Sequence, residues 1–329
     1  MSGYHKSRLG TPQERYQEVK IIWDKLWNQY NNGKRIRCQP NLPALNMYIS
    51  ACQSQHTTEA AEWAEQALFQ YHRLQPFSAG ACNKDKKKDN TEYGDDFSMV
   101  SYSDLPEPHS RINTQVCTSV LDCWQKSGHP DAGAKAQALM EWMLQEYKSS
   151  NDKGLQPNAY TFSAVIGAWA RSRRIGKPNK AQALLKDMQQ LHADGIVAEP
   201  PNVYCYTNVI SSCAYCLKEP SEMKQALDIA VETFHLVRQE STPTHVTYAA
   251  FFTALRNLVP ASDKRTAVAR NVFEEAAAAG QVTDLVVRRL LTMVTKDEAE
   301  CILQLSISSK DGMVSIGEIP AYWRRNVIA

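Results

Sequence analysis

The side chains of this chain that could do chemistry are small amides and hydroxyls that recur at a regular spacing. A Pro-Asn pair ends at Asn158 and another at Asn202, and a hydroxyl residue follows five positions after each, Ser163 and Thr207. Asn supplies both a hydrogen-bond donor and an acceptor, and the hydroxyl of Ser or Thr can act as either. A row of such groups along one face can distinguish the Watson–Crick edges of unpaired bases. The chemistry predicted is therefore hydrogen-bond recognition.

Motifs for catalysis, cofactor binding or metal binding are missing from the sequence. It contains no glycine-rich phosphate loop, no paired zinc motif and no nucleophile elbow. Cys213 and Cys216 form a C-x-x-C pair with no second pair at zinc spacing, which favours a structural role. We therefore expect a protein that is not an enzyme, holds no cofactor or metal, and takes no small-molecule substrate.

The composition is that of a folded protein with nearly balanced charge. The 329 residues are 43% hydrophobic, and 37 Lys and Arg against 35 Asp and Glu give a net charge of +2. This near-neutrality predicts few phosphate contacts with any nucleic acid. No stretch approaches the roughly 18 consecutive apolar residues of a membrane span, so we expect no membrane partner. The nine scattered cysteines predict a reducing compartment.

Internal self-similarity predicts the elements that position the polar row. Residues 135–139 and 180–184 both read Lys-Ala-Gln-Ala-Leu, 45 positions apart. Pro157 and Pro201 open matching segments 44 positions apart, and Pro243 opens another after 42 more. Apolar residues within a unit recur every three or four positions, which is typical of helices, in two stripes separated by Gly and Pro. Each unit is therefore predicted to be a pair of helices.

A single helix pair cannot bury both of its apolar stripes, so neighbouring pairs must stack. The fold class expected is all-α, a right-handed α-solenoid of stacked helix-turn-helix repeats. We expect residues 1–41 to form an N-terminal helix from a partial repeat, residues 42–284 to form the array, and residues 285–329 to form a terminal helical hairpin and tail. Residues 76–110 are polar and charged, which predicts a disordered insertion within the array.

The repeated unit resembles the pentatricopeptide repeat (PPR). The resemblance is carried by the Pro-Asn opening, by an aromatic, a small polar residue and Val-Ile in the first helix, and by Ala-x-x-Leu-x-x-x-Met in the second, as in residues 181–188. It covers residues 42 to about 284, with units longer than those of the family. The resemblance implies binding of single-stranded RNA, with one base read by each repeat.

The resemblance also implies roles for particular residues. In the family, a base is read by the polar residue after the aromatic of the first helix together with the last residue of the unit, and a residue two places into the unit wedges the base. Carried over to this sequence, the base-reading residues are Asn46, Asn113, Thr118, Asn158, Ser163, Asn202, Thr207, Thr244 and Ala249. The base-wedging residues are Gln115, Tyr160, Tyr204 and Val246.

The family's pairing rules imply a preferred RNA sequence. Thr118 with Asn158 and Ser163 with Asn202 resemble adenine-reading combinations. Asn46 with Asn113 resembles a pyrimidine-reading combination. Ala249 has no polar group with which to read a base. The resemblance therefore implies a pyrimidine-A-A core with weak selectivity after it.

Basic residues around one turn between helices are candidates for phosphate contacts. They are Arg171, Arg173, Arg174, Lys177 and Lys180. Both sets of residues have a second interpretation that the sequence leaves open. A charged cluster is also typical of a solvated surface, and an Asn just before a helix is also typical of an N-cap.

Two functions are compatible with the sequence. The first is a sequence-selective, single-stranded RNA-binding repeat protein that acts in organellar RNA processing, stability or translation beside other RNA-processing proteins. The resemblance implies a mitochondrion or plastid, and the cytoplasm is the alternative because no clear transit peptide is present. The second function is a helical-repeat scaffold for protein–protein interaction, in which the same face holds a peptide.

Overall fold

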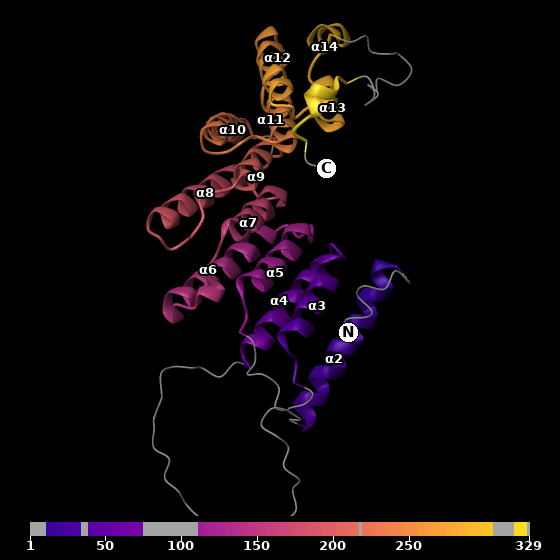
Figure 1. The fold of residues 1–329 in the computed structure, drawn as a ribbon, viewed down its shortest axis with the longest axis vertical. Helices are drawn as coiled ribbons and strands as arrows, with labels where there is room; N and C mark the ends of the chain where they lie inside the picture. Colours follow the sequence, from indigo (N-terminus) through magenta and orange to yellow (C-terminus); the bar gives the residue numbers. More distant parts are fainter. Residues whose placement is uncertain (1–10, 34–38, 75–110, 217–218, 305–318, 328–329) are drawn as a thin grey trace, which may run out of the picture.

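The computed structural model describes residues 11–33, 39–74, 111–216, 219–304 and 319–327. Every regular element in these residues is helical, which confirms the all-α class (Figure 1). None of the helices in this described part is long and apolar enough to cross a membrane. The predicted insertion at residues 76–110 lies outside the described residues.

The helices follow one another as pairs after the long helix α2 (Pro12–Gly33). The first helices of the pairs are α3 (Leu42–Gln53), α5 (Thr114–Lys126), α7 (Ala159–Arg171), α9 (Val203–Ala214), α11 (His245–Leu258) and α13 (Asp284–Leu291). The second helices are α4 (Thr58–His72), α6 (Ala132–Ser150), α8 (Lys177–Ala193), α10 (Pro220–Glu240), α12 (Asp263–Ala278) and α14 (Lys296–Leu303). Short 3₁₀ turns cover Lys153–Leu155 and Ala321–Arg324.

The first helices pack against one another in series. α3 contacts α5, α5 contacts α7, α7 contacts α9, α9 contacts α11, and α11 contacts α13. Each first helix also packs against the second helix of its own pair, and α2 packs against α3. Figure 1 shows the pairs succeeding one another along the long axis of the molecule. Equivalent positions of successive first helices are thereby brought side by side.

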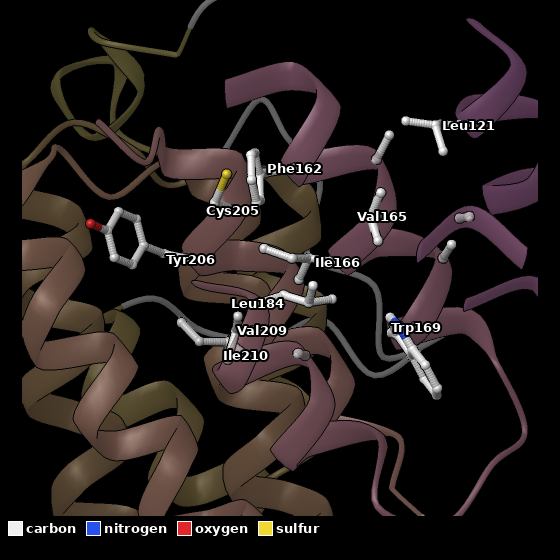
Figure 2. Packing of buried hydrophobic residues seen from close by; sticks show 14 of the residues in the cluster. Leu121, Phe162, Val165, Ile166, Trp169, Leu184, Cys205, Tyr206, Val209 and Ile210 are labelled. Carbon is white, nitrogen blue, oxygen red and sulfur yellow. The ribbon is translucent and has the colours of Figure 1, made fainter. Parts of the chain in front are cut away.

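The apolar stripes of these helices form the core. Phe162, Val165 and Ile166 of α7 are completely buried, and Figure 2 shows them packed with side chains from α8 and α9. Small residues allow the helices to approach closely. A Cβ atom at Gly133 of α6 would lie 2.5 Å from the Trp169 ring, so only glycine fits there. The core therefore extends from one helix pair to the next.

Candidate nucleic-acid interface

Three of the four predicted asparagines lie at the starts of helices and cap them, whereas Asn46 lies within α3. Oδ1 of Asn113 accepts a hydrogen bond from the Val116 backbone nitrogen at 3.0 Å, and Oδ1 of Asn158 accepts one from Thr161 at 3.0 Å. Oδ1 of Asn202 accepts from the backbone nitrogens of residues 204 and 205, both at 3.1 Å. The N-cap interpretation is thus confirmed for all three. Capping uses the amide oxygen, and no hydrogen bond to another described residue uses the amide nitrogen.

The predicted hydroxyls bond to the next unit along the chain. Thr118 Oγ1 lies 3.0 Å from Oγ1 of Thr161, the third residue of α7, and Thr207 Oγ1 lies 2.8 Å from Oγ1 of Thr247, the third residue of α11. Thr247 Oγ1 also accepts from the Thr244 backbone nitrogen at 3.2 Å, so Thr244 belongs to this second network. Thr118 is therefore linked to Asn158, and Thr207 to Thr244, through a threonine of the following helix, whereas no such link joins Ser163 to Asn202 among the described residues.

Exposure divides the predicted base-reading residues into two groups. The first group is half-buried and comprises Asn46, Asn113, Thr118, Asn158, Ser163, Asn202 and Thr244. Thr207 and Ala249 are only 6% and 4% exposed. These two residues belong to the packed interior and present little to a ligand.

The predicted wedging residues are all exposed. Tyr160 is 61%, Tyr204 58% and Val246 44% exposed, and Gln115 is also exposed. Each is the second residue of its helix, in α7, α9, α11 and α5 respectively. Large apolar side chains held in solvent at one repeated position are typical of a binding surface. Tyrosine rings in particular offer flat faces on which bases can stack.

A groove of about 500 Å³ brings five of the predicted residues together. It runs across α5, α7 and α9 and is here called the α5–α7–α9 groove. The predicted residues in its wall are Thr118, Tyr160, Ser163, Arg171 and Tyr204. They comprise two base-reading residues, two wedging residues and one phosphate-contact residue.

Side chains that sequence reasoning missed line the same groove. Asn208 and Gln125 approach it from α9 and α5, on either side of Gly167 in α7. A Cβ atom at Gly167 would lie 2.0 Å from the Gln125 side-chain amide and 3.0 Å from Asn208 Nδ2. The glycine therefore makes room for both amides. Its place inside an apolar helical stripe is the one signal in the sequence that could have indicated this crowding.

The groove contains one carboxylate, and neighbouring donors surround it. Asp122 Oδ2 accepts from Lys126 Nζ at 2.6 Å and from Gln53 Nε2 at 3.1 Å. The Gln125 amide, oriented to satisfy both of its neighbours, donates to Asp122 Oδ1 at 3.0 Å and accepts from Arg171 Nη1 at 2.8 Å. Arg171 and Asp122 are thus linked through one amide, which holds the guanidinium at the groove wall.

The five predicted phosphate-contact residues lie in different environments. Arg173 and Lys180 are exposed, and Arg174 forms an ion pair with Asp131 at 2.5 Å. Lys177 is only 4% exposed, and its Nζ donates to the carbonyl oxygens of residues 170 and 172 at 2.8 and 3.1 Å. Burial also lowers the pKa of this lysine. Its ammonium group caps the end of α7, so Lys177 is not retained among the phosphate contacts.

The cysteines lie within the helix packing. Cys213 is buried, and burial raises the pKa of its thiol to about 12. Cys216 is half-buried and lies two residues after the end of α9. No group of three or more metal-ligating side chains occurs in the part of the chain that the structure describes.

The groove, its two exposed tyrosines and its half-buried hydroxyls form the candidate interface. Compared with family models, with curated proteins and with solved structures, the chain matches none.

Proposed function

We propose that the chain is a right-handed α-solenoid of pentatricopeptide-like repeats that binds single-stranded RNA in the α5–α7–α9 groove. The bases stack against Tyr160 and Tyr204, and the polar groups between these rings read the base edges. In this proposal the protein acts in organellar RNA processing, stability or translation, in a mitochondrion or plastid and beside other RNA-processing proteins.

One observation carries this proposal. Residues chosen for three different roles, which are Thr118 and Ser163, Tyr160 and Tyr204, and Arg171, line one groove although the sequence spreads them over 87 positions. A groove that combines hydrogen-bonding groups, aromatic faces and a cation has the chemistry of a single-stranded nucleic-acid site.

The capping roles of the asparagines are compatible with this function. Capping at Asn158 and Asn202 occupies Oδ1, and each side-chain NH₂ group remains available to donate to a base. The cap also fixes the orientation of the amide, which lowers the entropy lost when a base binds.

The alternative function is a scaffold for protein–protein interaction. Asp122 in the groove and the net charge of +2 favour it, because a peptide needs no compensation for a phosphate backbone. In that case the tyrosines contact an extended peptide. Binding would then depend weakly on salt and would not depend on base identity.

A titration separates the two functions. We expect fluorescently labelled RNA with one A-A step in a uridine background to bind more tightly than a scrambled RNA, with affinity falling between 50 and 200 mM salt. Tyr160→Ala should weaken binding about tenfold because one stacking surface is removed. Tyr322→Ala is the matched control, since this tyrosine is 60% exposed and lies outside the groove. Absence of RNA binding at low salt would reject the proposal.

A further inference from the structure

The hydrogen bonds around α7 determine the direction in which the Thr118 hydroxyl donates. Oδ1 of Asn158 accepts from the Thr161 backbone nitrogen, so this atom is the carbonyl oxygen of the amide. The Thr161 hydroxyl donates its only hydrogen to the same Oδ1 at 3.1 Å. The contact between the hydroxyls of Thr118 and Thr161 therefore takes its hydrogen from Thr118. Thr118 retains lone pairs for a ligand and has no hydrogen to offer.

The next unit reverses this arrangement. Cys205 occupies the position in α9 that Thr161 occupies in α7, so no hydroxyl is present there to receive the Ser163 hydrogen. Instead, Asn208 Nδ2 donates to the backbone oxygen of Ser163 at 2.9 Å and to its Oγ at 3.3 Å. Ser163 Oγ is the acceptor in this contact because an NH₂ group only donates. Its own hydrogen finds no acceptor among the described residues.

The position of Asn208 depends on the groove floor. Its Nδ2 occupies space that a side chain on residue 167 would take, since a Cβ atom there would lie 3.0 Å away. Ser163 and Asn208 both line the groove beside Tyr160 and Tyr204. The Ser163 hydroxyl therefore lies among the groups that would face a bound base.

We propose that the two neighbouring subsites of the α5–α7–α9 groove have opposite hydrogen-bond polarity. Thr118 accepts from the exocyclic amine of one base, and Ser163 donates to a ring nitrogen or carbonyl of the next. Asn208 is a positioning residue that acts through Ser163. This inference rests on the proposed RNA-binding function and departs from the family's pairing rules, which give both subsites the same adenine preference.

Adenine analogues test the polarity in the unmodified protein. Purine riboside lacks the exocyclic amine, and 1-deazaadenosine lacks the N1 acceptor. Each replaces one adenosine of the A-A step in turn. At the adenosine that faces Thr118, we expect loss of the amine to weaken binding about fivefold. At the adenosine that faces Ser163, we expect loss of N1 to weaken binding about fivefold. At the second position, loss of the amine should change the affinity less than about twofold.

Asn208→Asp tests the positioning role. A carboxylate only accepts, so it loses the bond to the Ser163 backbone oxygen and can bond only to the Ser163 hydroxyl. That hydroxyl would then turn its hydrogen toward residue 208 and present lone pairs to the base. At this subsite, the affinity for RNA should then no longer depend on the N1 atom of the base and should depend on its exocyclic amine. Ser119→Asp is the control, because it adds the same charge to the groove without a hydrogen bond to Ser163. It should weaken binding of all the RNAs alike.

The outcomes separate this inference from the function on which it rests. If RNA binds but both positions respond alike to each analogue, the polarity is wrong and the RNA-binding function stands. An unchanged analogue profile in Asn208→Asp, with the variant folded by circular dichroism, also overturns the role of Asn208. If the unmodified protein binds no RNA, both proposals fall together.

Discussion

Two stretches of the chain are built from the same kind of helix pair but differ in which polar side chains they expose. Across α5, α7 and α9, Thr118 and Ser163 remain half-buried and line a groove. Across α9 and α11, the equivalent Thr207 and Ala249 are buried, although Thr207 bonds to Thr247 just as Thr118 bonds to Thr161. A conserved geometry of stacking therefore does not guarantee that a polar position remains accessible. The two hydroxyls make the same kind of bond to the following helix, and their exposure differs: Thr118 lines the groove, whereas Thr207 is buried.

The largest expected effect tests whether both stretches share one continuous core. Phe162→Ala in α7 and Phe252→Ala in α11 each remove a completely buried ring. We expect each to lower the free energy of unfolding by about 3–5 kcal/mol, because each leaves a cavity. Chemical denaturation followed by circular dichroism measures this loss. A loss under about 1 kcal/mol at either site would contradict equal packing of the two stretches.

The next effect concerns the exposed side chains at the second position of each helix. Tyr204→Ala should weaken RNA binding about tenfold, because the residue lines the groove and offers a stacking face. Val246→Ala, at the equivalent position of α11, should change the affinity less than about twofold, since valine has no aromatic face. Fluorescence anisotropy measures both variants. Equal losses would mean that the RNA path extends over both stretches.

A smaller effect compares the two threonines that bond to the following helix. Thr118→Val should weaken RNA binding about fivefold and leave unfolding nearly unchanged, because its hydroxyl reaches the surface. Thr207→Val should lower the free energy of unfolding by about 1 kcal/mol without affecting RNA binding, because its hydroxyl is buried. The reverse pattern, measured by denaturation and anisotropy on the same samples, would break the comparison.

The smallest effect separates two cations at the end of α7. Arg171→Gln should reduce the slope of log affinity against log salt by about 1, as expected for one lost phosphate contact. Lys177→Met should leave that slope unchanged and lower the melting temperature, because its ammonium group caps backbone carbonyls. A reduced slope in Lys177→Met would return this lysine to the phosphate-contact set.

The helix pairs could be predicted from sequence because the signals are local. An apolar stripe such as Phe162, Val165 and Ile166, and a Pro-Asn opening, are each complete within one unit. Asn208 and Gln125 could not be predicted because they meet over Gly167 from helices on either side of α7. The sequence shows the charge of a residue but not its burial. Lys177 is therefore predicted as a phosphate contact from sequence although its side chain is buried.

The asparagine caps restrict how such a protein can be re-engineered. Asn158 and Asn202 begin helices through the same side chains that the proposed function turns toward bases. Substitution at either position must therefore satisfy helix initiation, and the residues that do so well are Asn, Asp, Ser and Thr. The base preferences that can be engineered at these two positions are therefore limited to those that good N-cap residues can provide. A hydrophobic or basic side chain intended to read a base must be introduced elsewhere in the unit.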